Sequence, residues 1–333
     1  MHKELHTIQI IRDYMIKKGI LPKKASKIDE IYSFFQYLGS DEGYKKFNSL
    51  YILNYIYQYI SSEEVSKRKT SARVFEDLLA ILFSGEVTDS KKRKNLRNEV
   101  PDCFNLVKDK IAGNKREKVD LIFDNVYGVS VKTLMIDNKE LNLGSFEKKV
   151  LFDGLNVTEY LTERKTDSEL GLASIPRLKK LLEKIDEENN YQLFETRFID
   201  MFNYIFSDDL ILAIKNSTKM YLYFFTGKEF TNLVTKNTHD LASLLSIVNR
   251  WEGNSIRINR DSLIAHATKK VELDLSLLSD TVIAEVNKFD FKLHQSYVKY
   301  FNESNIEDIQ ITLIKELEKI FKEFESNIGE LKA

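Results

Sequence analysis

The stretch Lys118-Val-Asp-Leu-Ile-Phe-Asp-Asn-Val-Tyr-Gly-Val-Ser-Val-Lys-Thr-Leu-Met135 decides the fold that this sequence predicts. Apolar and polar residues alternate on both sides of a turn signal, Asp124-Asn125, and this pattern predicts two strands joined as a hairpin. A carboxylate, Asp120, and an ammonium, Lys132, stand within these strands, where an unpaired charge is costly. If the loop holds an odd number of residues, the two fall on one face and close together. Such a pair would hold a metal ion beside a positioned cation.

Length and composition indicate the class of protein. The chain has 333 residues, enough for one large or two ordinary domains, and its 43% hydrophobic and 30% charged residues are typical of soluble globular proteins. We expect no membrane segment and no signal peptide, because the sequence lacks the apolar runs that these need. A lone cysteine, Cys103, excludes an internal disulfide and indicates a cytoplasmic protein. The five histidines lack ligand spacing, which argues against a zinc site.

The N-terminal part of the chain is expected to be helical. Periodic apolar residues predict helices over 3–18, 26–38 and about 42–60, the last with a tyrosine and isoleucine stripe that we interpret as core. A fourth helix begins at Thr70 or Ser71 and is apolar nearly all round, so we expect it to be buried. Glu76 lies on this helix and has two interpretations, an ion pair with Arg73 or a carboxylate that faces a metal.

A basic run, Lys91-Lys92-Arg93-Lys94, precedes the hairpin in an expected loop. Runs of this kind are usually solvated surface. Beside a hairpin suited to a metal ion, binding of phosphates becomes the better explanation. The overall net charge of −1 does not exclude this, because local clustering matters more than the sum.

Helices and strands are expected to alternate after the hairpin. We predict a helix that begins at Ser145, with Glu147 in its first turn, where the helix dipole alone favours a carboxylate. A helix over 174–207, strands at 210–214 and 220–225, and helices near 228–234 and 238–250 follow. From about residue 305 the chain predicts an amphipathic helix that suits packing or dimerisation better than DNA contact.

The segment 255–260 alternates cleanly and predicts a strand with Ile256 and Ile258 inward. Its other face presents Arg257 and Asn259, followed by Arg260. Arginine and asparagine are the side chains that pair with guanine and adenine edges. An ordinary half-buried strand is the simpler interpretation of the pattern, and only the charged pair upstream favours contact with bases.

Taken together, Glu76 on a buried helix, Asp120, and Ser130-Val-Lys132 on the next strand resemble the PD-(D/E)XK nuclease superfamily, and within it a type II restriction endonuclease. The resemblance covers about 70–152 and the strand at 218–225. It implies an α/β (α+β) fold with an αβββαβ core and a mixed central sheet in a largely helical chain. Family members usually carry an acidic residue where Ser130 stands. Glu147, fifteen residues beyond Lys132, and Glu76 therefore compete as the second metal ligand beside Asp120.

This resemblance also implies a division of the chain and a set of partners. We expect an N-terminal helical region (1–66), a nuclease core (67–225) with a helical insertion at about 155–207, and a recognition or dimerisation region (226–333). The implied cofactor is Mg²⁺, with Mn²⁺ as a substitute. The implied partners are double-stranded DNA, a second copy of the chain in a homodimer, and a companion DNA methyltransferase. Residues expected to contact DNA are Lys91, Lys92, Arg93, Lys94, Ser130, Lys148, Arg257, Asn259 and Arg260.

Two other functions remain open from the sequence. The same fold could serve a repair or phage-defence nuclease that recognises DNA structure and not sequence. In a non-catalytic DNA-binding or interaction module, Asp120 and Lys132 would form only a cross-strand salt bridge, and Mg²⁺ would change nothing.

Overall fold

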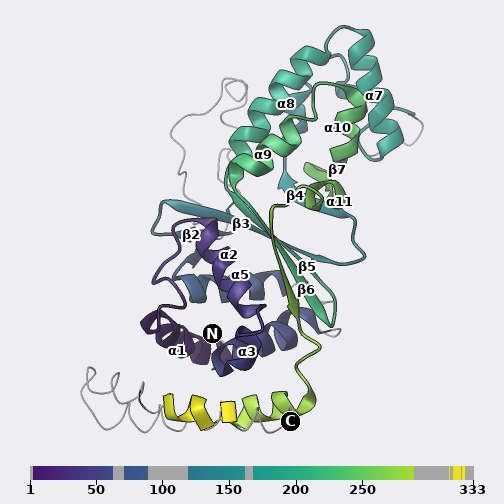
Figure 1. Cartoon of the computed structure of the whole chain (residues 1–333). Coiled ribbons are helices and arrows are strands. Elements are labelled where there is room, and N and C mark those ends of the chain that lie inside the picture. Colours follow the sequence, from purple (N-terminus) through teal and green to yellow (C-terminus); the bar gives the residue numbers. More distant parts are fainter. Residues whose placement is uncertain are drawn as a thin grey trace. The chain divides into compact units, whose positions relative to one another are not determined.

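Strands with apolar faces and amphipathic helices combine into an α+β structure in the computed structural model (Figure 1). The structure describes residues 3–62, 71–88, 119–161, 168–288, 315, 318–323 and 325–326. Contacts divide the chain into two units, one of Met1–Val87, Ile214–Leu222 and Lys270–Ala333, the other of Thr88–Ala213 and Tyr223–Lys269. The three domains drawn from the sequence stay a prediction.

A mixed sheet of six strands is the framework of the fold. Its strand order is β1-β2-β3-β5-β6-β9, so strands distant in the sequence become neighbours. The predicted strands at 210–214 and 220–225 are confirmed as β5 and β6, and all but the first residue of β5 is buried. The strands are β1 Glu86–Val87, β2 Leu121–Phe123, β3 Tyr127–Met135, β5 Asp209–Lys215, β6 Lys219–Phe225 and β9 Lys269–Asp274.

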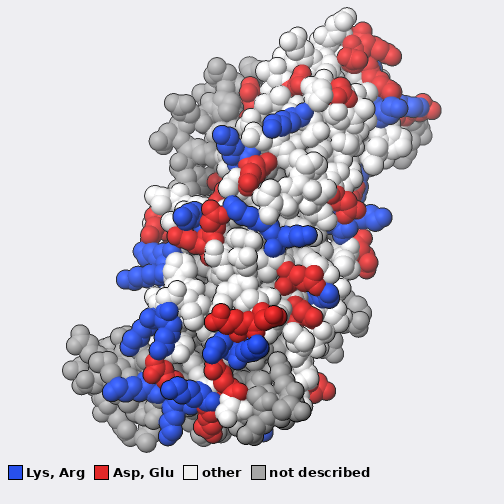
Figure 2. Space-filling model, in the orientation of Figure 1, with Lys and Arg blue, Asp and Glu red and all other residues white. Residues whose placement is uncertain are grey.

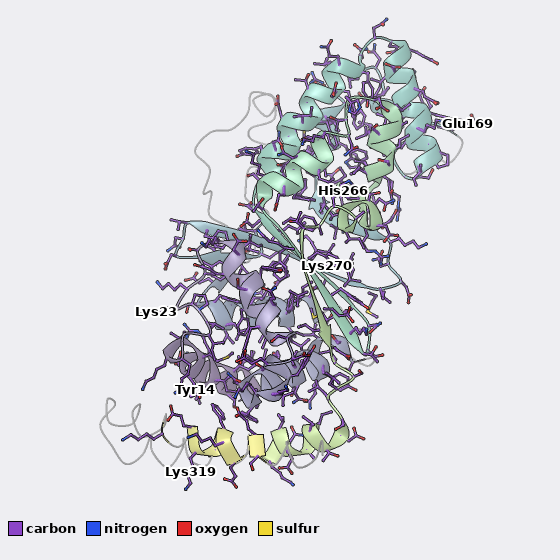
Figure 3. The ribbon with its side chains drawn as sticks, viewed as in Figure 1. Tyr14, Lys23, Glu169, His266, Lys270 and Lys319 are labelled. Atoms are coloured by element: carbon purple, nitrogen blue, oxygen red, sulfur yellow. The ribbon has the colours of Figure 1, made fainter. Side chains whose placement is uncertain are left out.

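In the first unit, helices bury the apolar stripes that the sequence predicts. The helix expected over 42–60 is three elements, η1, α3 and η2. The extended backbone of Lys46 (φ −104°, ψ 133°) separates η1 from α3, and the chain continues after α3 as the π-helix η2. At the C-terminal end, Phe321 packs against Tyr14 and Phe47, with ring centroids 4.8 and 5.1 Å apart (Figure 3 labels Tyr14). The helices are α1 Lys3–Lys17, α2 Ile28–Leu38, η1 Gly43–Lys45, α3 Phe47–Ile56, η2 Tyr57–Ser61 and α5 Ser71–Phe83.

In the second unit, helices pack around aromatic side chains and a small antiparallel sheet. The sheet has the order β4-β8-β7, with β4 Glu140–Ser145, β8 Ser255–Asn259 and β7 Val248–Glu252. Fully buried rings of this core include Phe146, Phe152, Phe194, Phe198 and Trp251. The helices are α6 Lys148–Leu151, η4 Thr158–Tyr160, α7 Ile175–Glu187, α8 Tyr191–Ile205, α9 Gly227–Thr235, α10 Leu241–Ile247 and α11 Arg260–Ile264.

Three sequence-based boundaries are wrong, each for a physical reason. The helix expected over 174–207 is two helices, because the chain turns at Asn189 with a φ of 61°. The helix expected over 238–250 ends at Ile247, and the chain continues as β7, which buries Trp251. The helix expected from Ser145 begins at Lys148, because Ser145 pairs with Ser255 and closes β4.

Among the described helices, none has the length and apolar character needed to cross a membrane.

Candidate active site on the β2–β3 hairpin

The hairpin turns where the sequence predicts. Asp124 and Asn125 both have a positive φ, 50° and 61°, as a tight turn between twisted strands requires. The turn is closed by the Val126 amide, which donates to the Phe123 carbonyl over 3.1 Å. Between β2 and β3 lie residues 124–126, an odd number, which was the condition for bringing the two charges together. The register pairs Leu121 with Val129, Ile122 with Gly128 and Phe123 with Tyr127.

Asp120 and Lys132 meet beside β3, so their predicted proximity is confirmed. Lys132 Nζ donates to Asp120 Oδ2 over 2.9 Å and to the Val131 carbonyl over 3.1 Å. The same carboxylate oxygen accepts from the Val131 amide at 2.7 Å and from Ser130 Oγ at 3.3 Å. The side chains of Asp120 and Lys132 are 14% and 21% exposed, so solvent and ligands reach the pair.

The end of β2 explains why a carboxylate is needed at this position. Because β2 begins at Leu121, paired with Val129, the Val131 amide lies beyond the strand ladder and needs another acceptor. Asp120 Oδ2 supplies it. Among the described residues, three donors reach this one oxygen, and Oδ1 is therefore the carboxylate atom suited to a further ligand. The strand residues Leu121, Phe123, Val129 and Val131 are buried, as is Val119 ahead of β2, so the carboxylate lies over an apolar layer.

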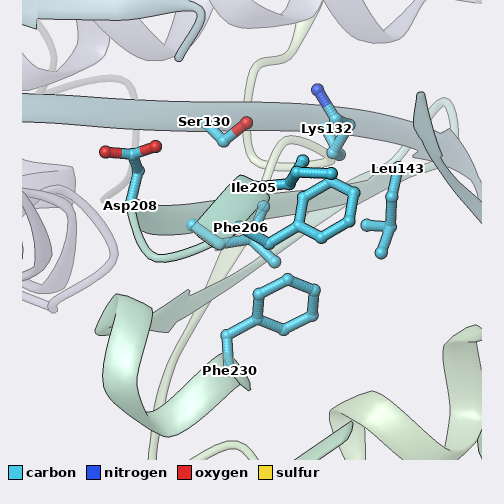
Figure 4. Close-up of a pocket in the computed structure, with 8 residues that line it drawn as sticks. Ser130, Lys132, Leu143, Ile205, Phe206, Asp208 and Phe230 are labelled. Atoms are coloured by element: carbon cyan, nitrogen blue, oxygen red, sulfur yellow. The ribbon is translucent and has the colours of Figure 1, made fainter. Parts of the chain in front are cut away.

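Ser130 and Lys132 also line a small pocket that holds a carboxylate the sequence analysis did not identify. Asp208, directly before β5, lines this pocket (Figure 4). The remaining walls are apolar, formed by Leu143, Ile205, Phe206, Leu210 and Phe230. The Asp208-Asp209 pair ahead of an apolar strand was the available signal in the sequence. The sequence does not indicate that β5 is next to β3 in the sheet, and this adjacency is what brings Asp208 close to Ser130 and Lys132.

The two glutamates proposed as the second metal ligand lie in different settings. Glu147 is the N-cap of α6, where Oε1 accepts from the Lys149 amide at 3.3 Å and Oε2 from Asn254 at 3.4 Å. This is the helix-terminus role that the dipole favours. Glu76 belongs to the other unit and forms an ion pair with Arg73 at 3.5 Å, the simpler of its two interpretations.

The side chains expected to contact DNA bases lie on or directly after β8 of the small sheet, and each has a partner within the chain. They are Arg257, Asn259 and Arg260. Ile256 and Ile258 are fully buried, as predicted, which puts Arg257 on the opposite face of β8. Arg257 pairs with Glu252, and Asn259 caps α11 by accepting from the Ser262 amide at 3.1 Å. Arg260 is 9% exposed; its guanidinium donates to the carbonyls of Ile136 and Asn138 and pairs with Asp261.

The small sheet also carries a bidentate ion pair between Arg250 of β7 and Glu140 of β4. Arg250 Nε and Nη2 donate to the Glu140 carboxylate over 2.8 to 3.1 Å. These hydrogen bonds hold the pKa of Glu140 below its ordinary value, and its burial opposes them.

The remaining expected DNA contacts are Lys148 and the basic run ahead of the hairpin. Lys148 begins α6 and is partly exposed. The basic run Lys91–Lys94 lies outside the described residues. Figure 2 shows Lys and Arg interspersed with Asp and Glu over the face in view. Within the described part of the chain, no three His, Cys, Asp or Glu side chains gather closely enough to hold a metal ion.

Comparisons with known proteins give no relative. No protein-family model, no curated protein and no solved structure matches this chain at a significant level.

Proposed function

We propose that this protein is a Mg²⁺-dependent endonuclease that hydrolyses phosphodiester bonds of duplex DNA at a short specific sequence. The observation that carries the proposal is the contact of Asp120 with Lys132, 2.9 Å apart and both partly exposed, beside the Ser130 hydroxyl. A carboxylate binds a hard divalent cation, and an ammonium binds a phosphate oxygen. In metal-assisted phosphodiester hydrolysis, the two groups can act together on one phosphate.

The order of elements supports the same proposal. Along the chain, α5, β1, β2 and β3 are followed by β4, then by α6, η4, α7 and α8, and then by β5. Apart from β4, which belongs to the small sheet, the order is one helix, three strands, a group of helices and a strand. The four strands are also consecutive in the sheet, in the order β1-β2-β3-β5. This agrees with the αβββαβ core that the resemblance to PD-(D/E)XK nucleases implies.

The residues at the hairpin fit Mg²⁺ by their chemistry. Mg²⁺ takes oxygen ligands, keeps several waters and is bound through one or two carboxylates together with substrate phosphates. Asp120 supplies a carboxylate whose orientation is fixed by the Val131 amide and Lys132. When bound, the ion would polarise the scissile phosphate and offset charge on the leaving oxygen.

The chain's own groups position the substrate. Lys132 Nζ carries three protons, of which two go to Asp120 and the Val131 carbonyl. The third can be donated to a non-bridging phosphate oxygen or to the attacking water. In a partly buried site, this charge stabilises the extra negative charge of the transition state. Attack by water on phosphorus and departure of the 3′ oxygen leave 5′-phosphate ends, as the resemblance implies.

Sequence specificity and partners are part of the proposal. A homodimer would match a symmetric site, because two-fold symmetry of the protein mirrors that of the DNA. Arg257 is the side chain on the small sheet suited to a guanine edge, and it would exchange its ion pair with Glu252 for the base. A companion DNA methyltransferase would protect the host's own copies of the site.

Digestion of phage DNA tests the proposal. We expect the wild-type chain to give discrete fragments with Mg²⁺ and no cleavage with EDTA. Asp120→Asn is expected to remove cleavage. Lys219→Met removes a Lys–Glu ion pair on another strand and should cleave as the wild type does. A smear in place of discrete fragments would refute sequence specificity, and intact DNA under all conditions would refute the nuclease.

A further inference from the structure

The pocket beneath β3 brings a second carboxylate to the candidate site. Asp208 shares this pocket with Ser130 and Lys132 (Figure 4). In the sheet, β2 and β5 lie on opposite sides of β3. Asp120 therefore comes to β3 from the β2 side and Asp208 from the β5 side, with Ser130 and Lys132 on the strand between them.

Two glycines allow the Asp208 segment to come this close. A Cβ on Gly128 of β3 would lie 3.3 Å from Asp208 Oδ1 and 2.4 Å from a methyl group of Val119. A Cβ on Gly227, the first residue of α9, would lie 3.0 Å from the Asp208 carbonyl carbon and would clash with the Ser207 carbonyl. The absence of both side chains gives the Asp208 carboxylate its place against β3.

The next residue fixes the backbone on which Asp208 stands. Asp209 Oδ2 accepts from the Tyr127 hydroxyl and Oδ1 from the Gly227 amide, both over 2.8 Å. These bonds join the start of β5 to the start of β3 and to the start of α9. Asp208 directly precedes this anchored residue and lines the pocket.

We propose that Asp208, together with Asp120, is an oxygen ligand of the divalent cation, with the Ser130 hydroxyl between the two carboxylates. This inference rests on the proposed nuclease function and assigns the second ligand to Asp208 instead of Glu147 or Glu76. Ser130 Oγ already contacts Asp120 Oδ2 at 3.3 Å and lines the Asp208 pocket, so it belongs to both halves of the site. Two carboxylates with waters are a sufficient protein ligand set for Mg²⁺.

Binding of Mn²⁺, followed by electron paramagnetic resonance of the free ion, tests the assignment without DNA. We expect Asp208→Asn and Asp120→Asn each to weaken Mn²⁺ binding by at least about tenfold, because each removes one of two carboxylate charges. Glu147→Gln and Glu76→Gln should bind as the wild type does. Loss of binding in Asp120→Asn and Glu147→Gln with retention in Asp208→Asn would overturn the inference and leave the nuclease proposal intact.

A second measurement uses the unchanged protein, so it does not depend on whether a variant folds. Fe²⁺ bound in place of Mg²⁺ generates hydroxyl radicals with ascorbate and peroxide, and these cut the backbone next to the metal. We expect cuts beside Asp120, Ser130 and Asp208. Cuts beside Asp120 and Glu147, or beside Asp120 and Glu76, would overturn the inference alone. Absence of Mn²⁺ binding and of local cuts would overturn the nuclease proposal as well.

Discussion

Replacing Lys215 by methionine removes a charge that the fold buries. Lys215 is the last residue of β5 and is 2% exposed. Its ammonium donates a hydrogen bond to the Ile60 carbonyl in the π-helix η2. Burial lowers the pKa of Lys215 from 10.5 to about 8, because the ammonium loses its water. Methionine keeps the length and the apolar stem of the side chain and has no proton to gain or lose.

The pKa of Lys215 gives the sign and size of the change in the free energy of unfolding with pH. The unfolded chain holds the Lys215 proton up to about pH 10.5, whereas the folded chain releases it near pH 8. Between these values the unfolded state binds more protons, so the free energy of unfolding rises with pH. Below pH 8 the full cost of the buried charge is present. At about 1.36 kcal/mol for each pKa unit, the rise is about 3 kcal/mol.

Urea unfolding of the wild type and Lys215→Met between pH 7 and pH 10 measures this rise. We expect the wild type to gain about 3 kcal/mol relative to Lys215→Met over this range. Burial raises the pKa of Tyr191, which opposes stability above pH 10, but both proteins share this effect. Lys219→Met, at a half-buried lysine on β6 that pairs with Glu272, should follow the wild type. Parallel pH profiles for wild type and Lys215→Met would show that the buried ammonium does not lower the free energy of unfolding below pH 8.

Three further predictions concern the hairpin and the small sheet. Tyr127→Phe removes the 2.8 Å hydrogen bond to Asp209 and should lower the free energy of unfolding by about 1 kcal/mol in urea unfolding. Asn125→Val puts a β-branched residue at a φ of 61° and should lower the melting temperature, whereas Asn125→Gly should not. Arg250→Gln should raise the pKa of Glu140 towards its ordinary value in an NMR titration. In the wild type the lowered pKa of Glu140 contributes stability at pH values above about 4.5, and this contribution is lost as the pH falls. The free energy of unfolding of the variant should therefore fall less than that of the wild type below about pH 4.5.

The hairpin could be predicted because its signals are local. Asp124 and Asn125 tolerate a positive φ, and the alternation of apolar residues indicates the buried face that Val119, Leu121 and Phe123 share. Ile122 is buried on the opposite face as well. The closeness of Asp120 and Lys132 then follows from the length of one short loop. A site formed by residues close together in the sequence can therefore be predicted from the sequence alone.

Features decided by distant pairing could not be predicted. Ser145 was expected to begin a helix, but Ser255 extends the strand through it, and this partner is far along the chain. Trp251 follows a helical pattern in sequence and is buried in a strand instead. Asp208 comes to the site because β5 is next to β3 in the sheet, an adjacency that no spacing in the sequence encodes.

The proposed nuclease requires Asp120 and Lys132 to act as a catalytic pair and not only as an ion pair that stabilises the hairpin. Cleavage rate and DNA affinity, measured together for wild type, Asp120→Asn and Lys132→Met on a cleavable duplex with Mg²⁺, test it most directly. We expect each variant to lose about two or more orders of magnitude in cleavage rate, while DNA affinity in Ca²⁺ stays near that of the wild type. Wild-type cleavage rates in both folded variants would contradict the claim.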